Sequence, residues 1–248
     1  MIAKPPCIDH PRAASLEELV ERDRDHACDG YGNDSVCVKV AAVANLPTRF
    51  GHFRAVAFWN NRDAKEHLAV VRGDIIGAEE VPARLHSECL TGDALGSLRC
   101  DCRDQLEAAL SDLGSRPRGL LLYLRQEGRG IGLLNKVRAY SLQDAGLDTV
   151  DANLALGFRD DERDYAIAAH MVASLGVRSL ALMTNNPDKI EQLRHYGIRV
   201  TARLPHVMPA NDFNGSYLET KAARCGHLIE LEERRKQKSA TRPRQLDL

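Results

Sequence analysis

Three cysteines lie close together in this sequence, among acidic and basic residues. Cys89, Cys100 and Cys102 all fall between Arg84 and Asp104. Thiolates are common ligands of Zn²⁺, and a catalytic zinc has three protein ligands and an open position for water. Zinc brings the pKa of a bound water to about 7, so that this water can attack an electrophilic carbon at neutral pH. The spacing therefore predicts an open zinc site and metal-assisted hydrolysis.

The spacing of the cysteines leaves other interpretations open. A closed structural site would use His86 as a fourth ligand, and without a metal the three thiols would be ordinary buried side chains. Zinc nucleobase deaminases combine His-x-Glu with a later Pro-Cys-x-x-Cys. Here His86-Ser87-Glu88 fits the first part, and Cys100-x-Cys102 does not fit the second. Deamination is therefore a rival hypothesis, while the acidic residues beside the cysteines favour an open site over a closed one.

A glycine-rich loop with two arginines follows further along the chain. Arg125 and Arg129 flank Glu127 in the run Arg-Gln-Glu-Gly-Arg-Gly-Ile-Gly, which lies between an apolar stretch and a helical pattern. In open α/β sheets phosphates bind where a strand is followed by a helix. The loop lacks the ending of a P-loop and the spacing of a dinucleotide fingerprint. An ordinary turn with solvated charges is the alternative.

Two further polar groups precede predicted helices. Residues 160–164 read Asp-Asp-Glu-Arg-Asp, which taken alone is typical of an acidic first turn. Thr184 and Lys189 bracket the helix-start signal Asn-Asn-Pro, where backbone N–H groups and a lysine can meet an anion. Simple helix capping is the alternative at the second group.

The apolar pattern predicts the strands that position these groups. Alternation over residues 36–40 and 53–58, with a turn at 46–48, predicts a hairpin, and further strands are expected at 67–71 and 82–85. Residues 120–124 and 177–183 are short apolar runs, typical of strands buried on both faces. The fold class is therefore α/β, with a mixed sheet, flanking helices and a β-rich N-terminal portion.

Helical spacing predicts three elements around the motifs. Residues 106–113 place Cys100 and Cys102 near the entrance of one helix. A second helix follows the glycine loop, with Leu133, Val137 and Tyr140 on one face, and a third begins near residue 164 and ends at a glycine.

Composition limits the classes of protein. The 248 residues are 44% hydrophobic and 28% charged, as in globular chains. A net charge of −1 argues against sequence-independent binding of nucleic acid. No apolar run approaches the roughly 20 residues of a membrane-spanning helix, and no secretory signal is evident, so we expect no membrane partner and a cytoplasmic location.

The chain divides into three parts by composition. Residues 1–35 are expected to form a poorly ordered N-terminal extension with a short helix over Leu16 to Arg22. Residues 36–229 form the catalytic domain, and residues 230–248 form a charged tail.

Taken together in their order, the motifs resemble GTP cyclohydrolase II of riboflavin biosynthesis. The resemblance runs from about Leu46 to His227 and rests on several motifs. They are Arg-Leu-His-Ser-Glu-Cys-Leu-Thr-Gly-Asp, Cys-Asp-Cys, Gln-Glu-Gly-Arg-Gly-Ile-Gly, Arg-Ala-Tyr, Asp-Glu-Arg-Asp and Thr-Asn-Asn-Pro. The resemblance implies a GTP cyclohydrolase II-like fold and hydrolysis of GTP to formate, pyrophosphate and 2,5-diamino-6-ribosylamino-4(3H)-pyrimidinone 5′-phosphate.

The resemblance also implies roles for individual residues. One Zn²⁺ per chain would be held by Cys89, Cys100 and Cys102, Mg²⁺ would accompany the GTP phosphates, and the chain would form a homodimer. Tyr140 would assist ring opening, and Asp161 would accept a proton. Contacts to GTP would come from Arg84, Leu85, His86, Ser87, Glu88, Gln105, Glu127, Gly128, Arg129, Thr149, Thr184 and Lys189.

Arg163 has two possible roles at the α-phosphate. The family assigns nucleophilic attack to this position. A guanidinium stays protonated, however, and makes a poor nucleophile, so stabilisation of charge on the transferring phosphoryl group is the physically favoured role.

Two alternatives to the full reaction stay open. A paralogue would open the imidazole ring and stop at the formamidopyrimidine, although the presence of Tyr140 speaks against it. A non-catalytic zinc- and nucleotide-binding module would bind the metal without turning over GTP.

Overall fold

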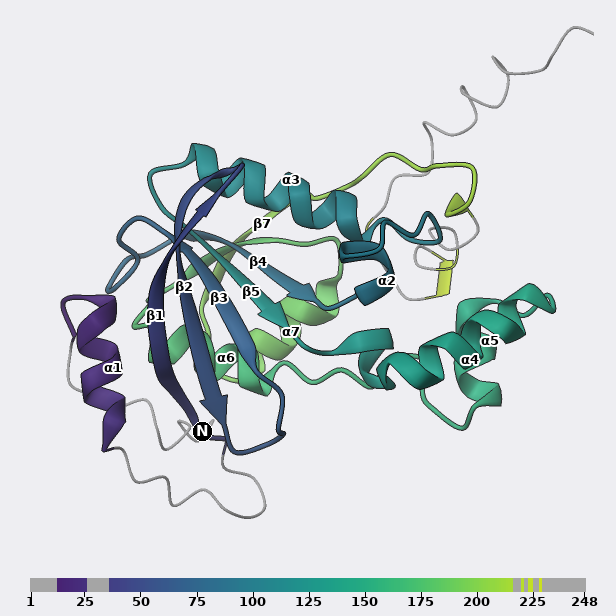
Figure 1. Cartoon of the computed structure of the whole chain (residues 1–248), viewed down its shortest axis with the longest axis horizontal. Coiled ribbons are helices and arrows are strands. Elements are labelled where there is room, and N and C mark those ends of the chain that lie inside the picture. Colours follow the sequence, from purple (N-terminus) through teal and green to yellow (C-terminus); the bar gives the residue numbers. More distant parts are fainter. Residues whose placement is uncertain (1–12, 26–35, 216–219, 221–222, 225–227, 229–248) are drawn as a thin grey trace, which may run out of the picture.

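A seven-stranded mixed sheet forms the centre of the protein (Figure 1). The structure is a computed structural model, and it describes residues 13–25, 36–215, 220, 223–224 and 228. The strand order is β1-β2-β3-β5-β4-β6-β7. The predicted α/β class, with a mixed sheet and flanking helices, is confirmed.

The antiparallel half of the sheet is the β-rich N-terminal portion. β1 (Val38–Thr48) and β2 (Gly51–Asn60) form the expected hairpin, and β2 pairs with β3 (His67–Arg72). The turn lies later than the sequence suggested, because Leu46 pairs with Phe53 and the strand continues to Thr48. Gly51 closes the turn with φ +125°, a conformation that favours glycine.

The other half of the sheet is parallel. β4 (Val81–Ser87) pairs in parallel with β5 (Gly119–Leu124) and with β6 (Leu180–Met183), and β6 pairs in parallel with β7 (Val200–Leu204). The carboxyl ends of these strands therefore meet at one edge. The cysteine stretch, the glycine-rich loop and the Thr184 turn all emerge from that edge.

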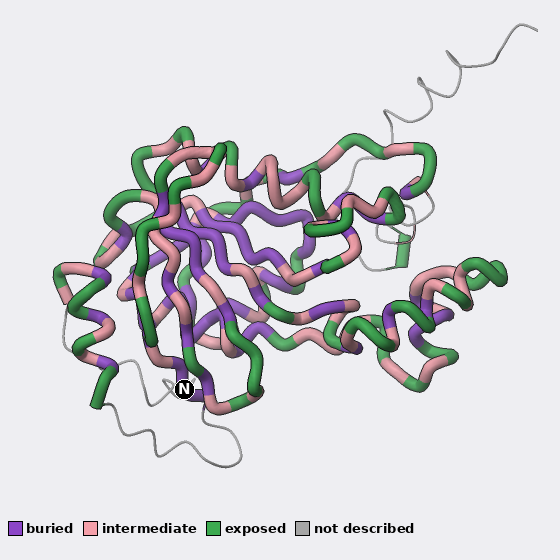
Figure 2. Tube along the Cα trace, in the orientation of Figure 1, coloured by how far each residue is buried: buried purple, intermediate pink, exposed green. Residues whose placement is uncertain are grey.

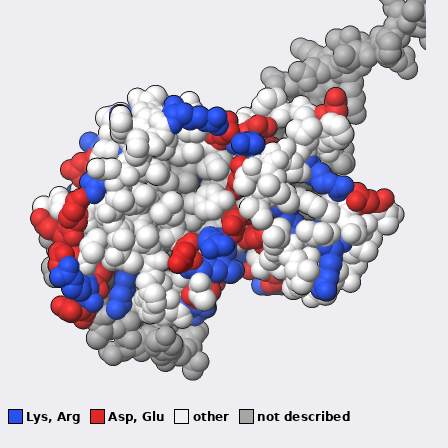
Figure 3. Space-filling model, viewed as in Figure 1, with Lys and Arg blue, Asp and Glu red and all other residues white. Residues whose placement is uncertain are grey.

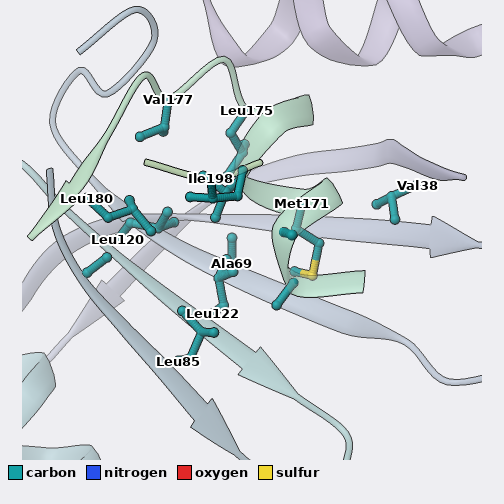
Figure 4. Packing of buried hydrophobic residues seen from close by; sticks show 14 of the residues in the cluster. Val38, Ala69, Leu85, Leu120, Leu122, Met171, Leu175, Val177, Leu180 and Ile198 are labelled. Atoms are coloured by element: carbon teal, nitrogen blue, oxygen red, sulfur yellow. The ribbon is translucent and has the colours of Figure 1, made fainter. Parts of the chain in front are cut away.

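Helices cover both faces of the sheet and bury the two sides of each central strand. Alternate side chains of β5, such as Leu120 and Leu122, join a core with α6 (Ala166–Ser174) (Figure 4). Leu121 points to the opposite face, where it meets Ala109 and Leu113 of α3 (Cys102–Ser115). This alternation explains why the strand reads as a continuous apolar run. On the first face, α7 (Pro187–His195) follows its predicted Asn186 cap and contributes Leu193 to the core.

A smaller helical unit projects beyond the carboxyl edge of the sheet (Figures 1 and 2). It consists of the 3-10 turn η1 (Glu127–Gly130), α4 (Gly132–Asp144) and α5 (Thr149–Ala155). The helix predicted after the glycine loop is confirmed as α4. Its residues Leu133 and Val137 are 40% and 50% exposed, whereas Lys136 and Ala139 are buried. The buried side of α4 faces the cysteines rather than the sheet.

The N-terminal helix is part of the packed fold. The expected helix is confirmed as α1 (Leu16–Arg24), which Ser15 caps by accepting a hydrogen bond from the Glu18 N–H. Leu16 and Leu19 enter the main core. Asp23 accepts a hydrogen bond from the Val40 N–H at 2.7 Å, beside the irregular register of β1. Residues 13–25 are therefore not a loose extension, while residues 1–12, 26–35 and the tail from 229 on lie outside the described residues.

The surface carries small groups of both charges. On the face shown in Figure 3, small groups of basic and acidic side chains lie at the rim of the sheet domain and on the helical unit, with uncharged residues over most of the sheet domain. Within the described ranges, none of the helices combines the length and apolar character needed to cross a bilayer.

Replacing Leu19 with alanine tests the contribution of α1. Leu19 is 1% exposed, so Leu19→Ala should lower the free energy of unfolding by about 2–4 kcal/mol, because a cavity is left in the core. Urea denaturation followed by circular dichroism measures this change. The exposed Glu21→Ala on the same helix is the control, and equal stability of the two variants would contradict the packing of α1.

Candidate metal and nucleotide site

The three cysteine sulfurs converge at the carboxyl edge of the sheet. Cys89 follows β4 and begins the short helix α2 (Leu90–Asp93), and Cys102 is the first residue of α3. The three Sγ atoms lie within 4.8 Å of one another, and those of Cys89 and Cys100 are 3.6 Å apart. All three thiols are free, whereas Cys37 is disulfide-bonded.

The donor set and its surroundings fit a zinc ion. Tetrahedral zinc with Zn–S bonds of about 2.3 Å separates its sulfurs by about 3.8 Å, close to the spacing of Cys89 and Cys100. Gly92 leaves room beside the sulfurs, because a Cβ there would lie 2.8 Å from Cys100 Sγ and 3.0 Å from Cys89 Sγ. The residue types, the spacing and the absence of a side chain at Gly92 together form a cradle for a metal.

His86 has a different role from the fourth ligand that a closed site would need. Its Nε2 lies 3.0 Å from a carboxylate oxygen of Asp93, and its ring stacks on Tyr123. Asp93 also accepts hydrogen bonds from the Tyr123 hydroxyl at 2.8 Å and from the Cys89 N–H at 3.0 Å. His86 and Asp93 thus hold the backbone of the cysteine loop. Among the described residues, the metal-binding group consists of the three cysteines without His86.

A buried lysine lies against the cysteines. Lys136 of α4 places its Nζ 3.0 Å from Cys89 Sγ and 2.6 Å from Glu127 Oε1. The pKa of Cys89 is lowered because the thiols of Cys100 and Cys102, and then Lys136, donate hydrogen bonds to its sulfur. Burial acts to lower the pKa of Lys136, but the hydrogen bonds to Cys89 and Glu127 outweigh it and the pKa is raised. Lys136 is therefore an ammonium ion beside a thiolate.

A cavity of about 480 Å³ opens in front of the cysteines. Its size falls within the range of about 300–1,000 Å³ that is usual for small-molecule sites. It lies between the sheet edge and the helical unit. The expected site residues that line it are Ser87, Glu88, Cys89, Cys100, Cys102, Glu127, Gly128, Arg129, Tyr140, Thr149 and Arg163.

Arg163 is oriented toward this cavity by a neighbouring carboxylate. Its Nε donates to Asp161 at 2.8 Å, its Nη2 forms an ion pair with the same carboxylate, and its Nη1 lies 3.5 Å from Ser87 Oγ. Burial acts to raise the pKa of Asp161, but hydrogen bonds from Arg163 lower it on balance. Asp161 is thus ionised at neutral pH, and it fixes the plane of the guanidinium.

Tyr140 of α4 contacts α2, the short helix that follows Cys89. Its hydroxyl is 3.2 Å from Thr91 Oγ1, and the guanidinium of Arg99 lies 4.9 Å from its ring centroid. Burial raises the pKa of Tyr140, and this effect exceeds the lowering by Thr91 and Lys136. Tyr140 is therefore a hydrogen-bond donor at neutral pH.

Several residues expected to contact GTP are buried and hydrogen-bonded within the protein. Arg84 donates to the Met183 carbonyl at 2.9 Å and to Gln105, and burial lowers its pKa to about 10. Lys189 donates to the Leu85 carbonyl at 2.8 Å. The expected residues that do not line the cavity are Arg84, Leu85, His86, Gln105, Asp161, Thr184 and Lys189.

The sequence interpretation missed Lys136, Arg99 and Asn153, which also line the cavity. For Lys136 a signal was present, because it precedes Tyr140 by one helical turn and so shares its face. The apolar residues Leu133 and Val137, which define the apolar pattern of α4, are exposed on the opposite face. Arg99 and Asn153 carry no comparable signal.

The fold and the site define a class of enzyme. A thiolate metal site beside an arginine-lined cavity, at the carboxyl edge of a parallel sheet, is typical of a metal-dependent hydrolase that acts on a small phosphorylated substrate.

Comparison with known proteins identifies the family. The GTP cyclohydrolase II family matches residues 38–205. The chain is 54% identical over 192 residues to GTP cyclohydrolase-2 of Picrophilus torridus, covering 77% of this chain and 100% of that protein. It is 56% identical over 188 residues to GTP cyclohydrolase-2 of Proteus mirabilis, covering 76% and 94%. The chain therefore belongs to the GTP cyclohydrolase II family of riboflavin biosynthesis.

Some relatives are longer. The chain is 56% identical over 217 residues to riboflavin biosynthesis protein RibBA of Bacillus mycoides, covering 88% of this chain and 53% of that protein. Among solved structures, a two-domain 3,4-dihydroxy-2-butanone 4-phosphate synthase from A. baumannii superposes with a TM-score of 0.39 at 15% identity, covering 76% of this chain and 44% of that chain. That likeness is too weak to support a conclusion about fold or function.

A methyl group at Gly92 should fill the cradle. Gly92→Ala places a Cβ against the sulfurs of Cys100 and Cys89, so we expect zinc affinity to fall at least about tenfold. Competition with a chromophoric chelator measures the affinity. Ala94→Ser, an exposed change two residues on, is the control, and wild-type affinity in Gly92→Ala would contradict a metal between these sulfurs.

Proposed function

We propose that this chain hydrolyses GTP to formate, pyrophosphate and 2,5-diamino-6-ribosylamino-4(3H)-pyrimidinone 5′-phosphate, as the first committed step of riboflavin biosynthesis. The observation that carries the proposal is one cavity lined by both the three thiols and Arg163. Ring opening and pyrophosphate release are two hydrolytic events on one substrate. Because both sets of side chains line the same cavity, we assign both to one bound GTP molecule.

The thiol end of the cavity is assigned to the purine ring. When bound by Cys89, Cys100 and Cys102, zinc supplies a water acidic enough to act as a nucleophile near neutral pH. Tyr140 lines the cavity as a protonated hydroxyl, so it can donate a proton or a hydrogen bond to a ring nitrogen as the imidazole opens. Glu88, which directly precedes Cys89, also lines the cavity and contributes a carboxylate.

The arginine end is assigned to the triphosphate. Arg129 and Arg163 both line the cavity, and Mg²⁺ is proposed to accompany the phosphates and neutralise part of their charge. Arg163 keeps its proton because a guanidinium has a pKa above about 12. We therefore assign it to stabilisation of charge at the α-phosphate rather than to nucleophilic attack, with Asp161 as the group that orients it.

We assign a supporting role to the backbone contacts of Lys189 and Arg84. Lys189 fixes the Leu85 carbonyl, and Arg84 ties β4 to β6 through the Met183 carbonyl. These contacts hold the end of β4, from which Ser87 and Glu88 enter the cavity. Direct contact of Arg84, Gln105, Thr184 and Lys189 with GTP, which the resemblance implies, stays a prediction.

Formate release from GTP and Mg²⁺ tests the proposed reaction. The purified protein should release formate and pyrophosphate, Cys100→Ser should abolish formate, and Arg163→Lys should lower kcat at least about 100-fold, because a lysine lacks the planar fork that Asp161 orients. Arg159→Lys is the control, since Arg159 is exposed and pairs with Glu162 on the same loop.

Three outcomes would contradict parts of this proposal. Ring opening without formate would indicate the formamidopyrimidine-forming reaction, and zinc binding without GTP turnover would indicate a non-catalytic module. Isolation of GMP covalently attached to Arg163 would overturn its charge-stabilising role.

We also propose a homodimer in which α4 contributes to the interface. Leu133, Leu134 and Val137 are 40%, 67% and 50% exposed on one side of this helix. Adjacent exposed apolar side chains on one helix are typical of a protein–protein interface. A second copy of the chain is the proposed partner, and the opposite side of α4 lines the cavity.

Size-exclusion chromatography with light scattering tests the dimer. The wild type should elute with the mass of two chains, and the combined change Leu134→Glu and Val137→Glu should give one chain, because charges cannot be buried unpaired. Arg178→Glu, an exposed charge reversal at the opposite edge of the sheet, is the control. A monomeric wild type, or a dimeric double variant, would contradict this interface.

A further inference from the structure

Lys136 is a buried cation for which neither the motifs nor the family residues provide a role. It is 8% exposed, and lysines are rarely this buried unless they are paired. Its Nζ lies 3.0 Å from Cys89 Sγ and 2.6 Å from Glu127 Oε1. The ammonium therefore bridges a metal-binding sulfur and a carboxylate of the glycine-rich loop.

Both oxygens of Glu127 are directed into the protein. Oε1 accepts from Lys136 and from the Gly128 N–H at 2.9 Å, and Oε2 accepts from the Leu90 N–H at 2.6 Å. Leu90 directly follows Cys89. The contacts thus form a closed ring that runs from the Cys89 sulfur through Lys136 and Glu127 back to the backbone beside Cys89.

We propose that Lys136, oriented by Glu127, is a positioning residue that holds the Cys89 sulfur in the metal-binding arrangement and offsets the negative charge of the three-thiolate site. This inference rests on the metal site of the proposed function. Three thiolates and one divalent cation carry one net negative charge, and the ammonium lies between this charge and the Glu127 carboxylate, so that it reduces the repulsion between them. Charge-assisted hydrogen bonds to a ligand also fix its direction, and loss of such partners typically weakens metal binding by about 10–100-fold.

The same ring links the two ends of the cavity. Glu127 begins η1, whose next residues, Gly128 and Arg129, also line the cavity, and Arg129 is assigned to the triphosphate. Lys136 and Tyr140 lie one helical turn apart on the buried side of α4. Placement of the Cys89 sulfur is therefore coupled to the loop that carries Arg129.

A role for Lys136 as a phosphate ligand is the competing interpretation, because its side chain also lines the cavity. The two roles differ in what they predict for the protein without GTP. A positioning residue alters metal binding in the absence of substrate. A phosphate ligand alters the KM for GTP and leaves metal binding unchanged.

Zinc affinity and the cobalt spectrum test the proposal without any substrate. In competition with a chromophoric chelator, Lys136→Met should lower the zinc affinity about 10–100-fold, and Glu127→Gln should also lower it. Lys136→Arg should have a zinc affinity between those of Lys136→Met and the wild type. With Co²⁺ in place of zinc, the thiolate-to-cobalt absorption of Lys136→Met should shift in position or intensity. Arg138→Met, an exposed cation on the same helix, should stay within about twofold of the wild type.

The outcomes separate this inference from the proposed function. Zinc affinity within twofold of the wild type together with an unchanged cobalt spectrum in Lys136→Met would overturn the inference, and a raised KM would then assign Lys136 to the phosphates. A wild type that binds no zinc at the cysteines would overturn both. A wild type that binds zinc but releases no formate would reject the proposed function alone. Circular dichroism of the metal-free variants verifies folding, and Glu127→Gln decides the outcome if Lys136→Met does not fold.

Discussion

Electrostatic repulsion among three thiolates is the constraint on which this site depends. Their sulfurs lie within 4.8 Å of one another, so ionisation of all three requires positive charge nearby. The structure provides one cation in Lys136 and a space beside Gly92 that suits a second, the metal. The start of α3 at Cys102 adds the favourable field of a helix N-terminus. Without such compensation, the thiols would stay protonated and could not act as a metal site.

The sheet brings these charges together from distant parts of the chain. Parallel pairing places the ends of β4, β5 and β6 at one edge, and each is followed by a loop with polar side chains. Buried contacts then fix the loops. The Asp93 carboxylate is hydrogen-bonded to His86, Tyr123 and the Cys89 N–H. The Glu127 carboxylate accepts from the Leu90 N–H and so connects the glycine-rich loop to the start of α2. The cavity is thus preorganised, which lowers the cost of ordering the groups that meet the substrate.

Local patterns determine much of this structure and were readable in the sequence. The apolar run 120–124, the helical spacing of 106–113 and the Asn186-Pro187 cap predicted β5, α3 and α7, and the three cysteines do converge. Properties that depend on tertiary packing were not readable. The apolar side of α4 is exposed because its polar side faces the cavity, and α1 is packed because Asp23 and Leu19 find partners far along the chain. Arg84 and His86 of β4 are buried, and the contact with substrate that their motif suggests stays a prediction.

X-ray absorption at the zinc edge of the purified wild-type protein tests the central claim most directly. An open site built by Cys89, Cys100 and Cys102 predicts one zinc per chain with three sulfur neighbours at about 2.3 Å and one oxygen neighbour at about 2.0 Å. A zinc with four sulfur neighbours, a zinc with the scattering pattern of an imidazole ligand, or a protein that purifies and reconstitutes without zinc would contradict it.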